Sequence, residues 1–170
     1  MAERRQEGHC DADWTARPDC PTTSRSCPKL GDVEKLDSHL RQRMEAARVA
    51  RLATVRPNAT PHIVPITFVL LGRSIVTAID HKPKATRSLQ RLHNIEVNPS
   101  VSVLVDQYDD DWDQLWWVRA DGIAHMEAPS ALPDALGLLV AKYPPYRKHR
   151  PRGPLIVIHV QQWASWSARS

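Results

Sequence analysis

The chain has 170 residues, of which 42% are hydrophobic and 25% are charged, as is typical of one globular domain with a substantial core. No apolar run approaches the roughly 18 residues of a membrane-spanning helix, and no signal-like segment opens the chain, so we expect a cytoplasmic protein without a membrane partner. The net charge of +4 permits an anionic ligand. It lacks the dense basic stripe typical of nucleic-acid-binding proteins, and we expect no nucleic-acid partner.

The first 31 residues are rich in charged and small polar side chains and contain almost no aliphatic ones. Such a segment cannot bury enough apolar surface to offset its ordering entropy. We therefore predict a disordered tail over 1–31 and one folded domain over 32–170. The tail holds all three cysteines, Cys10, Cys20 and Cys27. Their odd number and wide spacing favour reduced thiols over disulfides or a zinc site.

The apolar pattern predicts a first helix with Asp32 as its N-cap, continuing to Ala47. Runs of β-forming residues between turn signals predict strands over 49–56, 61–70, 74–79, 101–107, 115–126 and 155–162. Two more helices are predicted over 84–93 and 131–142, and the proline-rich segment 143–154 is predicted to be a loop. Six or so short, mostly antiparallel strands with few helices favour a β-barrel with flanking helices over a doubly wound sheet.

Cations gather where the helix over 84–93 is predicted to start, at Lys82, Lys84, Arg87 and Arg91. A helix that begins at Pro83 would place the last three of them on one face. The N-terminus of a helix offers unpaired N–H groups and a partial positive charge, so this segment suits a phosphate group. The alternative is a solvated charged face, and the residues alone leave the two interpretations open.

Pro65 interrupts the β-forming run 61–70 and removes one donor from the strand ladder. Proline in a strand indicates a sheet edge or a bulge, and at an edge a planar ring can meet exposed backbone groups. The alternative is that Pro65 only protects a sheet edge from aggregation.

Trp116 and Trp117 alternate along one predicted strand and therefore point to opposite faces. Either one of them lines a ring pocket or a dimer seam while the other packs in the core, or both are core or interface residues. The acidic run from Asp109 to Asp113 lacks the spacing and the glycine of a calcium loop, so we predict a solvated turn and no metal site. The chain also lacks the glycine-rich nucleotide-binding motifs and the G-x-S-x-G nucleophile motif.

Four stretches, Ala47–Val55, Pro61–Ile66, Asp80–Lys84 and Asn98–Gly122, resemble the pyridoxamine 5'-phosphate oxidase-like split-barrel family. The resemblance is closest to its actinobacterial branch of oxidoreductases that depend on coenzyme F420, a deazaflavin. It implies a split β-barrel homodimer with the cofactor at the subunit interface. It also implies hydride transfer between the cofactor and a small conjugated substrate, completed by a solvent proton or by a water bound to Arg119.

The same resemblance implies where the cofactor binds. The ring would lie against the second and third strands, at Val64, Pro65, Ile66, Thr67, Thr77, Ala78 and Ile79. The phosphate would meet Lys82, Lys84, Thr86 and Arg87, and Trp117 is the tryptophan that we assign to the ring pocket. Because the cofactor performs the hydride step, no catalytic side chain is predicted. An FMN-dependent oxidase or reductase and a non-catalytic flavin or deazaflavin carrier or sensor are the alternatives.

Overall fold

A computed structural model describes residues 36–79 and 89–168 of the chain. All of these residues belong to the unit Val33–Ser170. The predicted tail 1–31 and the cationic segment 80–88 lie outside the described residues. None of the described helices is both long and apolar enough to cross a membrane.

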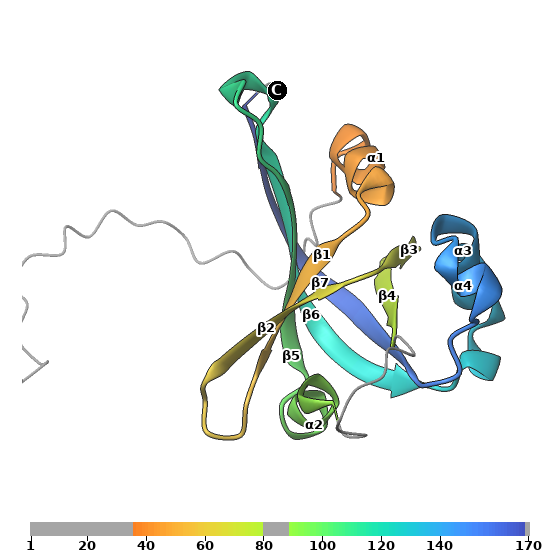
Figure 1. Cartoon of the computed structure of the whole chain (residues 1–170). Helices are drawn as coiled ribbons and strands as arrows, with labels where there is room; N and C mark the ends of the chain where they lie inside the picture. Colours follow the sequence, from red (N-terminus) through yellow and green to blue (C-terminus); the bar gives the residue numbers. More distant parts are fainter. Residues whose placement is uncertain (1–35, 80–88, 169–170) are drawn as a thin grey trace, which may run out of the picture. The chain divides into compact units, whose positions relative to one another are not determined.

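The described residues form a single antiparallel sheet of seven strands with the order β2-β1-β5-β6-β7-β4-β3. The strands are β1 (Ala50–Val55), β2 (Pro61–Ile66), β3 (Val69–Leu71), β4 (Ser74–Ala78), β5 (Ser100–Gln107), β6 (Trp116–Glu127) and β7 (Leu155–Ser167). The two edge strands, β2 and β3, follow each other in the chain with only Thr67 and Phe68 between them. The sheet therefore has to curl until its edges approach each other, and Figure 1 shows this curvature in β6 and β7. The predicted split β-barrel is confirmed.

Two of the predicted strand ranges are wrong. The range 61–70 is two strands, because the chain leaves the partner strand β1 at Thr67 and joins β4 after Phe68. The last strand does not end at 162 but continues to Ser167, because β6 extends beside it and pairs Trp117 with Trp166. Of the two alternatives for Pro65, a sheet edge or a bulge, the structure shows the edge, since β2 pairs only with β1 among the described strands.

The helices are α1 (Ser38–Ala46), α2 (Gln90–Val97), α3 (Pro133–Lys142) and α4 (Pro145–Lys148), with short 3-10 turns η1 (Trp112–Gln114) and η2 (Pro129–Ala131). The predicted first helix is shorter in the structure, and its predicted N-cap Asp32 lies outside the described residues. Asp37 caps α1, because its carboxylate accepts hydrogen bonds from the backbone N–H groups of His39 and Leu40 at 2.8 and 3.2 Å. The predicted loop 143–154 contains α4, which begins at Pro145, where a proline costs the helix no hydrogen bond.

The helix predicted over 84–93 is also different in the structure. α2 begins at Gln90, and its N-cap Leu89 has extended backbone angles (φ −85°, ψ 123°). A helix therefore cannot run unbroken from Pro83 to Arg91, and Arg91 does not share a helix face with Lys84 and Arg87. Arg91 is instead a buried residue of α2.

A buried polar network holds α2 against the first two strands. The amide nitrogen of Asn94 donates to the hydroxyl of Thr54 at 2.8 Å, and the amide oxygen of Asn94 accepts from Gln90 at 2.8 Å. The Thr54 hydroxyl also lies 3.3 Å from Nδ1 of His62. Burial lowers the pKa of His62, and the charges of Arg56 and Arg91 lower it further, so this imidazole is neutral at pH 7. The network fixes the helix that directly follows the cationic segment 80–88.

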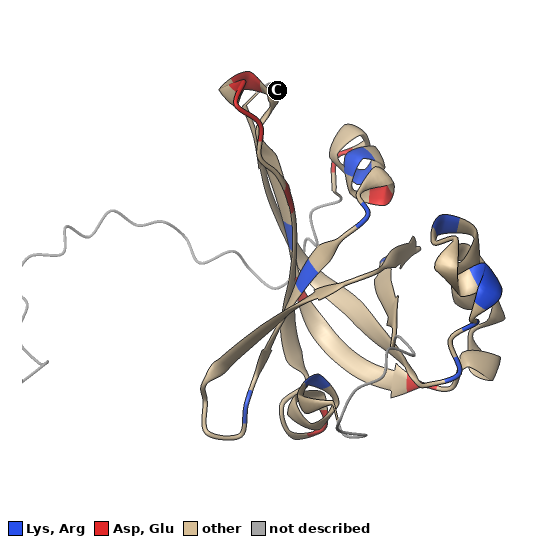
Figure 2. Cartoon of the chain, in the orientation of Figure 1, with Lys and Arg blue, Asp and Glu red and all other residues tan. Residues whose placement is uncertain are grey.

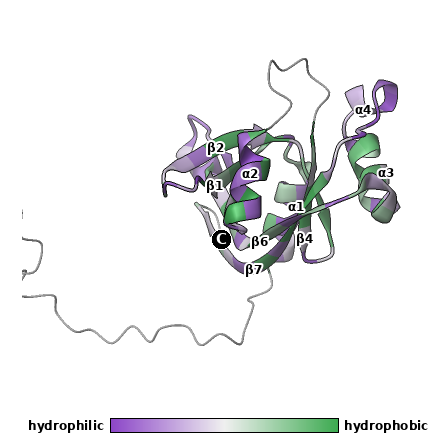
Figure 3. Ribbon diagram, turned by 90° about the horizontal axis from the view of Figure 1, so that it is seen from below, coloured by the Kyte–Doolittle hydropathy of each residue, from purple (hydrophilic) through white to green (hydrophobic). Residues whose placement is uncertain are grey.

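Two hydrophobic clusters stabilise the fold. The larger one contains the inward side chains of β1, β5, β6 and β7, and it also includes Met44 of α1 and Ile95 of α2. Figure 1 shows these two helices at opposite ends of the strands. The second cluster lies between α3–α4 and the strands β3, β4 and β7, and includes Leu139 and Leu155. Figure 3 shows α3 as a largely hydrophobic helix beside the sheet, as this packing requires.

The hydroxyl of Tyr143 bridges the break between β2 and β3. It lies 2.9 Å from the backbone nitrogen of Phe68, 2.9 Å from the Phe68 oxygen and 3.1 Å from the Arg48 oxygen. It accepts from the Phe68 N–H and donates its proton to a carbonyl, so it replaces ladder hydrogen bonds that the break removes. Burial raises the pKa of this phenol, which keeps it protonated.

Replacing Tyr143 with phenylalanine should lower the free energy of unfolding by about 1–3 kcal/mol, because the buried Phe68 N–H would lose its partner. Urea denaturation of both proteins measures this difference. Tyr108→Phe is the control, since Tyr108 is 74% exposed and its loss should stay within about 0.5 kcal/mol. Equal losses in the two variants would show that the Tyr143 hydroxyl does not stabilise the barrel.

Candidate functional site

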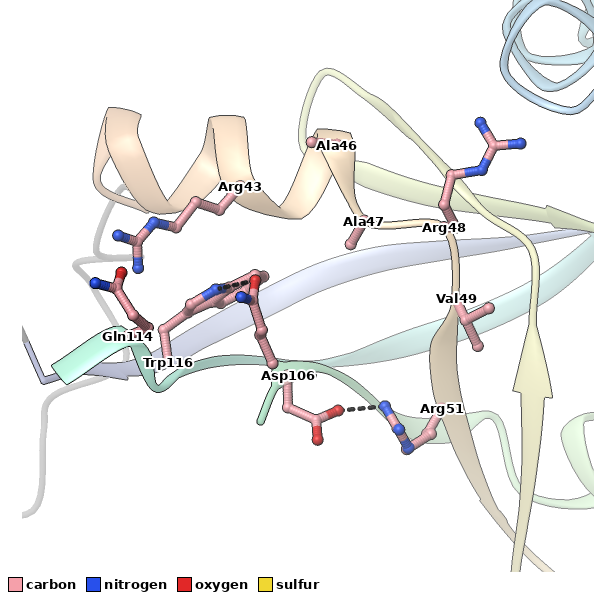
Figure 4. A pocket seen from close by; sticks show the side chains of 10 residues that line it. Arg43, Ala46, Ala47, Arg48, Val49, Arg51, Asp106, Gln114 and Trp116 are labelled. Atoms are coloured by element: carbon pink, nitrogen blue, oxygen red, sulfur yellow. Dashed lines mark hydrogen bonds and ion pairs between the residues drawn. The ribbon is translucent and has the colours of Figure 1, made fainter. Parts of the chain in front are cut away.

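A cavity of about 550 Å³ lies between α1 with the start of β1 on one side and the connection from β5 to β6 on the other. This volume is within the range of small-molecule sites in proteins. Figure 4 shows the cavity from close by. It is lined by Arg43, Ala46, Ala47, Arg48, Val49, Arg51, Asp106, Gln107, Gln114 and Trp116.

The wall that faces Trp116 has room because α1 ends in two small residues, Ala46 and Ala47. Trp116 lies across from them in Figure 4. Its indole is only 5% exposed and its Nε1–H donates to Oε1 of Gln107 at 3.1 Å. The ring is therefore held in one orientation, and its apolar surface forms part of the cavity.

The cavity is electropositive, with three guanidinium groups and one carboxylate in its lining. Arg51 is paired with Asp106. Arg43 lies 5.9 Å from the centre of the Trp116 ring and 3.4 Å from the Ser167 hydroxyl, and Arg48 lies 5.0 Å from the centre of the Tyr143 ring. Among the described residues, no carboxylate forms an ion pair with either Arg43 or Arg48. Two of the three cations thus keep their charge available for a ligand.

The cavity borders the segment that is predicted to bind the cofactor ring. Arg51 of β1 pairs with Pro65 of β2, and Ala50 pairs with Ile66. The outer edge of β2 has no partner strand, and Thr77 and Ala78 of β4 pair with β7 alone, within the part of the chain that the structure describes. The backbone at both predicted ring contacts is therefore open on one side.

The predicted ring residues differ in what they can offer a ligand. Ile66, Thr77 and Ala78 are buried, so only their backbone groups are available. Pro65 is exposed, and Val64 and Ile79 are partly exposed. Thr67 already uses its hydroxyl in a 2.8 Å hydrogen bond with Tyr146. These placements agree with a ring that meets backbone edges, and they leave the assignment of each residue a prediction.

The predicted phosphate residues Lys82, Lys84, Thr86 and Arg87 lie outside the described residues, and their role stays a prediction. Trp117 lies on β6 with its side chain on the opposite face from Trp116. The structure does not bring Trp117 into the cavity.

Trp117 belongs to a face of the sheet that we call the outer face. On this face, Trp117 is flanked by Asp106 of β5 and Trp166 of β7. Two ion pairs also lie on it, Arg51–Asp106 between β1 and β5 and Arg119–Asp121 along β6. Trp166 is 48% exposed, and Ile63 on β2 is 64% exposed on the same face. Exposed apolar side chains in one layer are typical of a contact surface. Arg119 is paired with Asp121 at 3.0 Å, so any water it holds would lie on this face.

The acidic run at the end of the β5–β6 connection is a turn, as Figure 2 shows by the red ribbon at its tip. The carboxylate of Asp109 accepts from the Asp111 N–H at 3.0 Å, and that of Asp111 accepts from the Asp113 N–H at 3.1 Å. These carboxylates stabilise the turn that ends in η1. Among the described residues, no three His, Cys, Asp or Glu side chains gather as metal ligands.

A second cationic cluster lies next to the cavity. The amine of Lys142 lies 4.1 Å from the centre of the Phe68 ring and 5.6 Å from that of Tyr143, beside Arg48. Burial and, to a lesser extent, the charge of Arg48 lower the pKa of Lys142 to about 8, while the charge of Glu45 opposes the shift.

This shift has a consequence for stability that can be measured. The folded-state pKa of about 8 lies below the ordinary 10.5, so between these values the unfolded chain binds more protons and stability should rise with pH. Lys142→Met should remove this rise, while Lys148→Met at the exposed end of α4 should keep it. Urea midpoints at about pH 7.5 and 9.5 measure the effect, below the range where Tyr143 ionises. An identical pH dependence in all three proteins would contradict this account of Lys142.

Arg43, Arg48, Arg51, Gln114 and Trp116 are site residues that sequence reasoning did not identify. The signal available was the crowding of arginines from 41 to 51, which by itself is typical of a solvated helix face. For Trp116 and Trp117, the alternation of side chains along a strand predicted that the two rings lie on opposite faces of the sheet. It did not predict which of them faces the core.

Residues 36–167 match the family described as pyridoxamine 5'-phosphate oxidase. Among curated proteins, no sequence matches the chain.

Several solved structures share the fold. One is a conserved hypothetical protein from Mycobacterium tuberculosis, 22% identical, with a TM-score of 0.63 over 82% of this chain and 89% of that one. An FAD-binding protein from Mesorhizobium loti is 18% identical, with a TM-score of 0.56 over 76% and 94%. The heme storage protein HutZ from Vibrio cholerae is 18% identical, with a TM-score of 0.60 over 79% and 95%. At these identities the likeness shows the fold alone.

Proposed function

Since the chain belongs to the pyridoxamine 5'-phosphate oxidase family, we propose that it is an oxidoreductase that uses coenzyme F420. FMN is the alternative cofactor. The observation that carries the proposal is the open backbone edge of β2 beside an electropositive cavity, in a chain whose cations gather at 82–87. When bound, the cofactor supplies hydride transfer to or from a small conjugated substrate.

The residues of this chain fit such a cofactor. The free edge of β2 offers N–H and C=O groups to the polar rim of a planar ring, and the open side of Thr77 and Ala78 offers the same. Lys82, Lys84 and Arg87 supply charge-assisted donors for a phosphate. Trp116 and the alanines of α1 give the neighbouring cavity its apolar part. The protein thus binds and orients, and no acid–base side chain is required.

We propose that the protein acts as a homodimer whose contact surface is the outer face of the sheet. The neighbouring Trp117 and Trp166, of which Trp166 is 48% exposed, and the exposed Ile63 on the same face support this assignment, because aromatic side chains are enriched in protein–protein interfaces. Light scattering at micromolar concentration should give about twice the chain mass of 19.2 kDa. Trp166→Glu should shift the mass toward the monomer. A mass near 19.2 kDa for the unmodified protein would contradict the dimer.

An activity measurement separates an enzyme from a carrier or sensor. Protein is mixed with reduced F420 and a panel of conjugated acceptors, such as quinones and unsaturated ketones, and the oxidation of the cofactor is followed against a protein-free control. An enzyme should accelerate oxidation with at least one acceptor. Tight binding with no acceleration for any acceptor would favour the carrier. Acceleration with FMN and not with F420 would establish the alternative cofactor.

A further inference from the structure

The cavity under α1 has features that the proposed cofactor contacts do not use. Among the described residues, its cations come from α1 and β1 and its aromatic surface comes from β6. These features suit a second ligand group beside the proposed cofactor.

Charge is the first indication of what that group is. Arg43 and Arg48 carry guanidinium groups that no carboxylate neutralises among the described residues. By contrast, Arg41, two residues before Arg43, is paired with Glu45 at 3.0 Å and donates to the Gly72 oxygen at 3.2 Å. On this helix the arginine outside the cavity is ion-paired, whereas the arginine inside the cavity has no carboxylate partner among the described residues. A guanidinium fork binds a carboxylate through two parallel hydrogen bonds.

Shape is the second indication. Trp116 is fixed by its hydrogen bond to Gln107 and presents its ring to the cavity, opposite the small side chains of Ala46 and Ala47 (Figure 4). Because Trp116 is only 5% exposed, a ligand reaches only the open edge of the indole, and a thin planar apolar group suits the space between this edge and the small residues. The same hydrogen bond uses only the oxygen of the Gln107 amide, so its NH₂ group is a further donor at the cavity.

Position is the third indication. The β1 residues of the cavity pair directly with β2, at Arg51–Pro65 and Ala50–Ile66. A ligand in the cavity therefore lies next to the segment at which the cofactor ring is proposed to bind. Asp106 would repel an anion, but its carboxylate is neutralised by Arg51.

We infer that the cavity is the substrate subsite and that it selects a planar conjugated carboxylate, with the conjugated part at the open edge of Trp116 and the carboxylate on Arg43. This inference rests on the proposed function, because it names the substrate class of the same site. Arg48 at the rim, which points toward α3 in Figure 4, adds long-range attraction.

The test is calorimetric titration of the cofactor-free protein with trans-cinnamate, a planar conjugated carboxylate. Cinnamamide, which has the same shape and no charge, is the matched ligand. Cinnamate should bind about tenfold more tightly than cinnamamide, which is the low end expected for one charge-assisted contact. Raising the salt from about 20 to 300 mM should weaken only cinnamate, because salt screens a partly exposed charge. This comparison needs no substitution.

Arg43→Met should abolish the preference for cinnamate and leave cinnamamide binding unchanged. Arg41→Met is the control on the same helix and should keep the preference. Equal binding of the two ligands, absence of binding, or equal effects of the two variants would overturn the inference. If F420 binds and cinnamate does not, the inference fails and the proposed function stands. If cinnamate binds and neither cofactor does, the anion site is supported and its role as a substrate subsite is overturned.

Discussion

Replacing Lys84 or Arg87 with alanine should weaken cofactor binding by about ten- to a hundredfold. Each side chain is proposed to make a charge-assisted hydrogen bond to the cofactor phosphate, of about 1.5–3 kcal/mol, and 1.4 kcal/mol is a factor of ten in a dissociation constant. Fluorescence titration of the variants with F420 measures the loss. Thermal stability should change little, since removing one of several like charges relieves repulsion.

Lys148→Ala is the control for this prediction, because Lys148 is an exposed cation at the end of α4. It should leave the dissociation constant nearly unchanged. The loss in Lys84→Ala should also be smaller at high salt, where screening already weakens the unmodified protein. Equal small effects at Lys84, Arg87 and Lys148 would mean that the segment 82–87 is a solvated basic surface, and the phosphate site would have to be abandoned.

Gly122→Ala should destabilise the barrel by about 3 kcal/mol or more. A Cβ at this position would lie 2.3 Å from the backbone oxygen of His159 and 3.1 Å from Cα of Val160. Both are backbone atoms, so the strands themselves have to move, and forced overpacking of this kind costs at least the upper part of the usual range. The close approach occurs where the pairing of β6 with β7 shifts between Asp121 and Gly122.

Gly137→Ala is the matched control and should act in the opposite direction. Gly137 lies within α3, and a Cβ there would meet nothing within 4 Å. Alanine in an exposed helix position is favoured over glycine by about 0.5–1 kcal/mol. Urea denaturation should therefore show a large loss for Gly122→Ala and a small gain for Gly137→Ala. A loss below about 1 kcal/mol at Gly122 would show that the two strands are free to separate there.

Local signals predicted the fold class well because most of its strands are defined locally. β1, β5 and β6 alternate buried and exposed residues, and turn residues mark their ends, so pattern and burial agree. The break between β2 and β3 could not be read in this way. It arises because the barrel closes at Thr67 and Phe68, and Tyr143, distant in sequence, satisfies the Phe68 backbone.

The predicted helix boundaries were wrong for a different reason. Asp32 and Asp37 are both good N-cap residues, and the apolar pattern alone does not distinguish them, whereas in the structure Asp37 caps α1. Likewise, Leu89 follows a segment rich in helix-forming residues, and its extended backbone reflects the register that buries Asn94 against Thr54.

The candidate site likewise contains some features that are local in the sequence and others that only the fold brings together. The sequence carried the cations at 82–87 and the edge strand with Pro65, both of which are local features. The cavity joins Arg43 from a helix, Arg51 from the first strand and Trp116 from the sixth. Their proximity depends on the order of strands in the sheet, in which β5 brings β6 toward β1. No spacing along the chain encodes that order.

The central claim is that this barrel binds a deazaflavin, and separate titrations of the purified protein with F420 and FMN test it most directly. Dissociation constants and stoichiometries from fluorescence are compared under the same conditions. The account predicts saturable binding of one F420 per chain, with a lower dissociation constant than for FMN. Saturable binding of FMN alone would identify FMN as the cofactor of the same site. Failure of both cofactors to bind would contradict the claim.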